Sequence, residues 1–199
     1  VQAASPDFAF DMDLIATGPL VFHGENGFSQ KSAEGQASYY YSQPFYKISG
    51  TLNLPEGDIP VTGSAWLDRE WSSQPLSDDQ KGWDWFSLSF EDGEKMMGFQ
   101  LRQSNGSYYT SATWIDANGE TQSYPDGAFM AEPLEETRVA ERDVPIRWRV
   151  ILPDRDLDAE VLALMPKAWM DVSIPYWEGP VGISGSHFGR GYLEMTGYE

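Results

Sequence analysis

The chain has 199 residues, a formal net charge of −18 and no cysteine. The surplus of carboxylates disfavours binding to nucleic acid and to anionic membrane surfaces, because both reward clustered positive charge. The lack of cysteine excludes disulfides, thiol nucleophiles and cysteine metal sites, and no apolar run is long enough to predict a transmembrane segment.

Residues 1–36 open with a strand pattern and then lose it. Apolar residues alternate with acidic or small ones over Phe8–Leu14, which is typical of a strand with one buried face. Gly18-Pro19 and then Gly24–Gly27 interrupt the alternation. Two interpretations remain. The segment is a linker or arm whose strand is exchanged with a preceding domain, or it is a strand of the same domain as residues 37–199.

Residues 37–199 carry repeated strand and turn patterns. Period-two alternation returns at Ile48–Leu54 and again in the region from Trp83 to Thr121. Three turn-forming tetrapeptides divide that region: Glu91–Glu94, Ser104–Ser107 and Asp116–Gly119. The sequence therefore predicts a meander of antiparallel strands.

Two later segments allow different assignments. Residues 122–145 hold prolines and many charges, and we predict a loop or a cover over one end of a barrel. Asp158–Met165 is the one helix candidate and fits a strand equally well. An all-β chain with many short strands forms a sandwich or a barrel.

The strand pattern over residues 61–68 gives the most informative face. Successive strand side chains point to opposite faces, so Trp66 and Asp68 share a face with two hydroxyl groups. Trp83 and Trp85 share a face of the next strand, and we expect them close to Trp66. A carboxyl group among aromatic rings has a raised pKa and can act as a general acid near neutral pH.

The alternatives are simpler structural roles. Asp68 could form a surface ion pair with Arg69 or cap a turn, and the tryptophans could be ordinary core. His23 and His187 lack any metal-ligand spacing, so we predict no metal site. Gly182–Gly185 does not have the Gly-x-Ser-x-Gly spacing of a serine hydrolase. We expect no cofactor.

Several short segments form a specific pattern when their order and spacing are taken together. They are His23–Ser29, Ala37–Ser42, Gly50–Leu52, Val61–Trp71, Gly82–Ser87, Tyr176–Gly179 and Gly189–Tyr198. This pattern resembles the C-terminal part of AttH-like proteins, the family that includes carotenoid 1,2-hydratases (CrtC-like), kievitone hydratases and fungal lipocalin-like Diels–Alderases.

The resemblance implies a lipocalin-like, calycin-like antiparallel β-barrel with little helix and a cavity for an apolar small molecule. Typical members carry two tandem lipocalin-like barrels and are often exported. We therefore expect this chain to hold the second barrel, with an N-terminal tandem domain as its partner.

The resemblance also implies site residues. An aromatic-x-Asp pair looks catalytic in the hydratases, and Trp66 and Asp68 occupy its positions, with Glu70 beside them. The ligand-binding residues expected from the same segments are Trp71, Trp83, Trp85, Asp84, Tyr40, Trp177, Glu178, Tyr192 and Glu194. Carotenoid hydratases usually have Tyr where Trp66 stands, and many AttH-like members have His where Arg69 stands, which weakens the case for a carotenoid substrate.

Three functions fit these observations. In a hydratase, protonated Asp68 would donate a proton to a C=C bond, aromatic faces would stabilise the carbocation, and water held by Glu70, Asp84 or Glu178 would attack it. A non-catalytic carrier of an apolar ligand is the second, and an ion pair between Asp68 and Arg69 would favour it. The third is a cofactor-free cyclase resembling the Diels–Alderases, which would tolerate loss of Asp68.

Overall fold

The computed structural model describes residues 1–74 and 77–198, and it confirms the all-β prediction. Residues 75–76 and 199, which belong to the predicted 37–199 domain, lie outside the described residues. The strands are β1 (Gln2–Ala4), β2 (Ala9–Ala16), β3 (Val21–Phe22), β4 (Phe28–Gln30), β5 (Ala37–Leu54), β6 (Gly57–Trp71), β7 (Gln80–Phe90), β8 (Lys95–Gln103), β9 (Tyr108–Ile115), β10 (Thr121–Tyr124), β11 (Met130–Val139), β12 (Arg142–Leu152), β13 (Leu157–Ala163), β14 (Trp169–Met170), β15 (Tyr176–Gly185) and β16 (Gly189–Thr196). A short 3-10 helix, Pro153–Arg155, joins β12 to β13. No helix in the described ranges is both long and apolar enough to cross a membrane.

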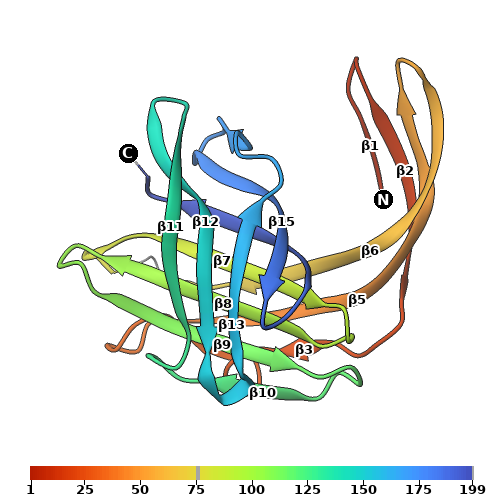
Figure 1. Ribbon diagram of the computed structural model, residues 1–199. Helices are drawn as coiled ribbons and strands as arrows, with labels where there is room; N and C mark the ends of the chain where they lie inside the picture. Colours follow the sequence, from red (N-terminus) through yellow and green to blue (C-terminus); the bar gives the residue numbers. More distant parts are fainter. Residues whose placement is uncertain (75–76, 199) are drawn as a thin grey trace.

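The strands form two curled antiparallel sheets, as a lipocalin-like fold requires (Figure 1). The ten-stranded sheet has the order β10-β9-β8-β7-β16-β15-β13-β12-β11, with β14 paired to β15. The six-stranded sheet has the order β1-β2-β5-β3, and β4 and β6 also pair with β5. The meander predicted from Trp83 to Thr121 is confirmed as β7, β8, β9 and the start of β10.

Large side chains fill the interior of the ten-stranded sheet. Alternate residues of β7 point inward, so Phe86 and Leu88 are fully buried while their neighbours face the other way. Trp114, Trp148 and Trp177 are also buried in this cluster. Because these rings occupy the interior, the large cavity of the protein lies outside it.

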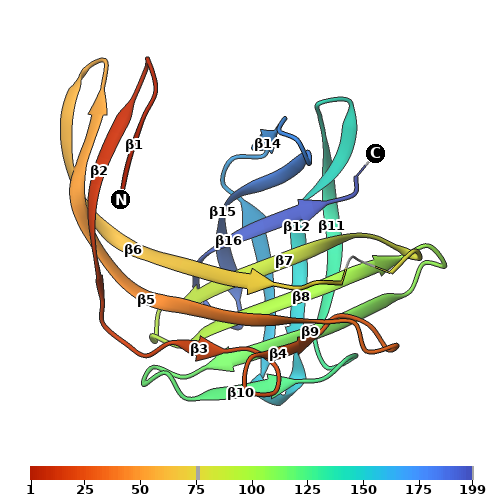
Figure 2. The same cartoon turned by 180° about the vertical axis from the view of Figure 1, so that it is seen from behind.

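Two long strands of the six-stranded sheet cover the outer face of the other sheet. Figure 2 shows β5 and β6 running alongside β7, β8 and β9. Their near halves pair Tyr39–Gln43 with Leu67–Trp71, and Tyr40 packs against residues of β8 and β9. A β-bulge at Pro44 and Phe45, opposite Trp66, separates these halves from the far ones. Bulges bend a strand and redirect nearby side chains, and they are common beside binding sites.

The far halves of β5 and β6 join β2 and β1 in a projecting arm (Figure 1). The predicted strand over Phe8–Leu14 is confirmed as β2. One arm face is apolar because registered residues on three strands share it. Across β2, β5 and β6 these rows are Phe10–Leu52–Ile59, Met12–Gly50–Val61 and Leu14–Ile48–Gly63. Ile59 is 45% exposed, so this face lacks full cover.

The loop predicted for residues 122–145 is wrong. This segment forms the end of β10, all of β11 and the start of β12. Its charges lie on the solvent face, where Glu135 and Glu132 of β11 lie within 4 Å of the arginines Arg147 and Arg149 of β12. Pro133 is tolerated because β11 is an edge strand with a bulge directly after this residue.

The region of the helix candidate Asp158–Met165 is a strand. Residues 157–163 form β13, and their burial alternates along the whole strand. β13 pairs with β12 on one side and β15 on the other. This ladder satisfies its backbone groups, and the buried apolar residues alternate with Asp158 and Glu160 on the solvent face.

Candidate functional site

A cavity of about 1000 Å³ lies between the two sheets. The near halves of β5 and β6 form one wall, and β7, β8 and β16 form the other. The aromatic part of its lining consists of Tyr40, Trp66, Trp71, Trp83, Trp85, Phe99 and Tyr192. This volume suits a medium-sized apolar molecule, for which such walls are typical.

Asp68 is the carboxyl group at the centre of the β5–β6 wall. The Tyr40 hydroxyl donates a hydrogen bond to Asp68 Oδ1 over 2.7 Å, and the Ser42 hydroxyl donates to the same oxygen. The Trp85 indole N–H donates to the Tyr40 oxygen over 2.9 Å. Strand register explains this meeting, because Ser42 is directly opposite Asp68 in the β5–β6 ladder.

The surroundings of Asp68 favour its protonated form. Burial by the surrounding protein raises the pKa of Asp68, and hydrogen bonds from Ser42 and Tyr40 and the nearby Trp66 indole partly oppose this. No ion pair in the described part of the chain includes Asp68, and Arg69 lies on the opposite face of β6. The side chain opens onto the cavity, so a ligand can reach it.

Glu70 lies on the same face of β6 but has a cationic partner. Lys31 Nζ is 2.8 Å from Glu70 Oε1, and the Ser38 hydroxyl donates to the same oxygen. The ammonium group also lies over the Phe99 ring, 4.1 Å from its centroid. Burial lowers the pKa of Lys31, and the charge of Glu70 opposes this. Glu70 is therefore less available to hold water than an unpaired carboxylate would be.

A second acidic group lies on the opposite wall. Glu194 of β16 accepts a 2.7 Å hydrogen bond from the Trp83 indole, and Glu178 of β15 is its partner in the ladder. Burial raises the pKa of Glu194, donation by Trp83 lowers it, and the charge of Glu178 raises it further. Tyr192 also lines this wall. Glu178 has no cationic partner within the described ranges, so it can accept hydrogen bonds from water.

Two residues expected at the site lie elsewhere. Asp84 is fully buried on the inner side of β7, where it forms an ion pair with Arg102. It also accepts hydrogen bonds from Gln100 and Tyr198 over 2.9 and 2.8 Å. Trp177 belongs to the interior cluster, and its indole donates to a backbone carbonyl. The physical reason is strand alternation, which turns each of them away from the cavity.

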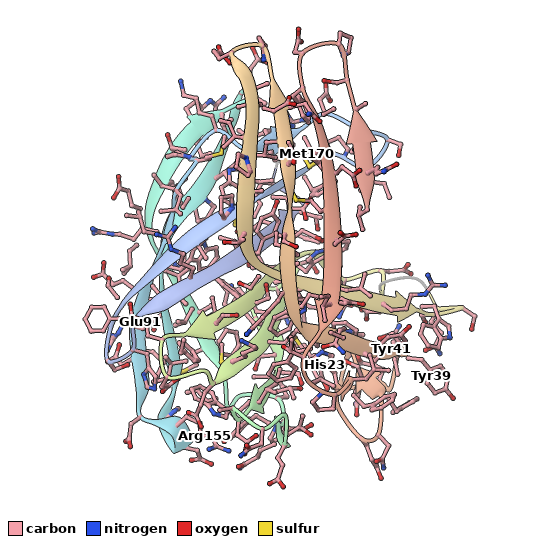
Figure 3. All side chains as sticks on the ribbon, turned by 90° about the vertical axis from the view of Figure 1, so that its right-hand side faces the viewer. His23, Tyr39, Tyr41, Glu91, Arg155 and Met170 are labelled. Carbon is pink, nitrogen blue, oxygen red and sulfur yellow. The ribbon has the colours of Figure 1, made fainter. Side chains whose placement is uncertain are left out.

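Trp71 lies partly at the cavity and partly in an aromatic cluster outside it. It contributes to the cavity rim, but its ring stacks on Tyr39 at a centroid distance of 5.9 Å and meets Tyr41 edge-on at 6.1 Å. Figure 3 shows Tyr39 and Tyr41 together near the outer edge of the molecule, with His23 further inside. Trp71 is 52% exposed, so most of its ring faces solvent and not a ligand.

His23 is brought to the site by a short excursion of the chain. β3 and β4 both pair with β5, and the residues between them leave the ladder and return. Gly24 and Gly27 have φ values of 66° and 93°, which L side chains rarely adopt. His23 is fully buried, and its Nε2 atom is 2.7 Å from Ser42 Oγ.

Sequence reasoning missed Ser42 and Lys31 and gave His23 no role at the site. Ser42 falls in the same segment as Tyr40, and its position opposite Asp68 depends on a cross-strand register next to the bulge at Pro44 and Phe45. Lys31 lies just beyond the segment His23–Ser29 and belongs to no motif. In the described ranges, no three His, Asp or Glu side chains form a group suited to a metal ion.

Comparison with known proteins gives the family. The model of the AttH-like family matches residues 1–198. The crystal structure of an AttH candidate from Nitrosomonas europaea is 38% identical with a TM-score of 0.90, and the match covers 100% of this chain but 64% of that protein. Kievitone hydratase from Nectria haematococca shares the fold, with 20% identity, a TM-score of 0.80 and coverage of 98% and 63%. No functionally curated protein matches. The family match and the 38% identity along its whole length show that the chain belongs to the AttH-like family.

Proposed function

We propose that this protein adds water to a C=C bond of an apolar isoprenoid or polyketide-type molecule, with Asp68 as the acid. The observation that carries the proposal is a carboxyl group that opens onto an aromatic cavity and forms no ion pair within the described part of the chain. Membership of the AttH-like family and a fold shared with a hydratase, kievitone hydratase, support it.

The hydrogen bonds at Asp68 indicate where its proton lies. Both hydroxyl donors, Tyr40 and Ser42, bind Oδ1, so the proton of the acid form belongs on Oδ2. That oxygen transfers the proton to one alkene carbon and keeps the electron pair of the O–H bond. The other carbon becomes a carbocation, which the faces of Trp66, Trp83 and Trp85 can stabilise.

Water completes the reaction. Its oxygen bonds to the carbocation, and one of its protons passes to the Asp68 carboxylate, directly or through Glu178, so the net change is addition of one water molecule and the acid form of Asp68 is restored. Glu178 is the best-placed residue to orient this water, because Glu70 is paired with Lys31 and Asp84 is sealed behind β7.

The test separates a hydratase from a carrier and from a cyclase. Wild type, Asp68→Asn and the surface control Asp158→Asn are incubated with an extract of apolar metabolites in ¹⁸O-labelled water and examined by native mass spectrometry. We expect all three to bind a ligand, and wild type and Asp158→Asn to return it with labelled water added. Release of the ligand unchanged by every variant would establish a carrier, and an isomerised product from Asp68→Asn would point to a cyclase.

We further propose that the apolar arm face packs against an additional lipocalin-like domain of a longer protein. The chain spans 64% of the Nitrosomonas protein, which leaves room for such a domain. The rows through Phe10, Met12 and Leu14 present apolar side chains on three adjacent strands. Apolar faces of this kind are usually covered in the assembled protein. Typical members of the family are often exported, and we propose export for this protein as well.

A further inference from the structure

A chain of hydrogen bonds extends from Asp68 to a histidine that does not touch the cavity. His23 Nε2 is 2.7 Å from Ser42 Oγ, and Ser42 donates to Asp68 Oδ1. The imidazole also packs on the Tyr40 ring, with 4.2 Å between the centroids. His23 therefore contacts the Ser42 hydroxyl and the Tyr40 ring, which belong to the two residues that donate to Asp68, although it does not line the cavity.

Counting protons along this chain fixes its direction. Ser42 has one hydroxyl proton, and it is directed at Asp68. The contact with Nε2 then requires a proton on that nitrogen, which makes His23 the donor and Ser42 the acceptor. The opposite tautomer would direct the Ser42 proton away from Asp68. Nδ1 is buried and has no hydrogen-bond partner among the described residues, so the tautomer protonated on Nε2 places the one N–H of the ring where it has an acceptor.

The imidazole is held neutral, as this arrangement needs. Burial lowers the pKa of His23 to about 3, and the charge of Lys31 acts in the same direction. A neutral ring with its proton on Nε2 keeps one fixed donor toward Ser42 at pH values above this pKa. The ring supplies no charge that would compete with Asp68.

We propose that His23 is a positioning residue, which donates to Ser42 and so directs the Ser42 hydroxyl at Asp68 Oδ1, leaving Oδ2 to hold the reactive proton. This inference rests on the proposed acid role of Asp68 for its catalytic meaning but not for its geometry. As Oδ2 gives up its proton, negative charge develops on the carboxyl group, and a polarised Ser42 donor stabilises it. Interactions that strengthen in the transition state raise the rate of the chemical step.

The first experiment measures the titration of Asp68 directly by ¹³C NMR of aspartate-labelled protein, with Asp68→Asn to assign the signal. His23→Leu removes the donor to Ser42, so the carboxylate is less stabilised and the midpoint pH of Asp68 should rise. His23→Gln keeps an N–H donor and should restore the wild-type midpoint. We expect about a tenfold change in the ratio of protonated to ionised Asp68 for His23→Leu.

Ser42 supplies the matched control. In a Ser42→Ala background the link is already cut, so His23→Leu should not shift the midpoint further. The other titratable groups around Asp68 are Tyr40, Glu70, Lys31 and Glu194, and they are unchanged in every variant. An equal shift by His23→Leu in both backgrounds would show that the residue acts through packing or hydration, and the proposal would fail.

The tautomer gives an independent check. ¹⁵N NMR of histidine-labelled protein should show a neutral His23 with its proton on Nε2 across the titration of Asp68, and a proton on Nδ1 would overturn the proposal. With an active substrate, His23→Leu should lower kcat about tenfold with KM little changed, and His23→Gln should recover it. If the NMR results hold and no water is added to any ligand, the hydratase proposal fails while the positioning role of His23 stands.

Discussion

Asp68 and Asp84 lie on β6 and β7, strands of the two opposite cavity walls, and have opposite surroundings. Asp84 is sealed inside and balanced by the guanidinium group of Arg102. Asp68 has hydroxyl donors and, among the residues that the structure describes, no ion-pair partner, and it opens onto the cavity. A paired interior carboxylate stabilises the fold by satisfying its partner, whereas an unpaired one at a cavity wall costs stability and is available for chemistry.

At the residue scale, Asp68→Asn should stabilise the protein at neutral pH. The pKa of Asp68 is raised above the unfolded value of 3.8, so between these values the folded state binds more protons and stability falls as pH rises. Asn keeps the shape without the charge. We expect a gain of at most about 1 kcal/mol at pH 7, since cavity water screens the group. The gain should vanish below pH 3.8 in denaturant unfolding curves.

Asp158 provides the control with the opposite sign. Hydrogen bonding to Arg149 lowers its pKa, so its contribution is present above the unfolded value and is lost as pH falls through the folded one. Asp158→Asn should therefore lower stability at pH 7. A loss of stability in Asp68→Asn as well would show that the carboxylate of Asp68 contributes to the fold.

Asp84→Ala should be among the most damaging single changes. It leaves the Arg102 guanidinium without its carboxylate in the interior, and loss of one partner of a buried ion pair costs about 3–5 kcal/mol. Chemical unfolding followed by tryptophan fluorescence measures the loss. The double variant Asp84→Leu with Arg102→Met removes both charges and should recover much of it. An unchanged midpoint in Asp84→Ala would contradict this account.

At the element scale, adjacent residues of β7 have different roles. Those on its inner face stabilise the fold, and those on its other face line the cavity. Phe86 is fully buried and meets Trp148 edge-on, with 5.6 Å between ring centroids. Trp85 points the other way and lines the cavity. Phe86→Ala should cost about 3–5 kcal/mol and leave the affinity of the folded protein for its ligand largely intact.

Trp85→Ala is the matched change on the cavity face. It should cost less stability than Phe86→Ala and weaken ligand binding more, because it removes a cavity ring and the donor to Tyr40. Unfolding curves and native mass spectrometry measure the two effects separately. Equal losses of binding from both variants would mean that the faces of β7 are coupled.

The same strand shows how far the sequence predicts the site. Alternation correctly places Trp83 and Trp85 on one face and Asp84 with Phe86 on the other. The pattern alone therefore argues against Asp84 as a cavity residue. The many charges of residues 122–145 led to the incorrect prediction of a loop, because an edge strand can also carry charges, as ion pairs on its solvent face. Ser42 could not be predicted, since its place opposite Asp68 depends on a cross-strand register that a bulge fixes.

At the scale of the whole molecule, three regions have distinct tasks. The interior of the ten-stranded sheet is filled with aromatic rings, and the space between the sheets forms the cavity. The arm extends β5 and β6 beyond both, as Figures 1 and 2 show from opposite sides. The strands that hold Tyr40 and Asp68 therefore continue directly into the arm. A domain bound to the arm could tilt these strands and change the cavity wall.

Hydrogen exchange tests whether the arm has such a partner. In the 199-residue chain, amides of β2 and of the far halves of β5 and β6 should exchange much faster than those of β7 and β8, because one apolar face lacks cover and an edge strand frays. In a longer protein that includes the proposed domain, the arm amides should become protected while β7 and β8 stay unchanged. Leu52→Lys should abolish this added protection without altering β7, since it places a charge on the middle strand of the apolar face. Equal exchange of the arm in both proteins would show that the proposed domain does not cover its apolar face.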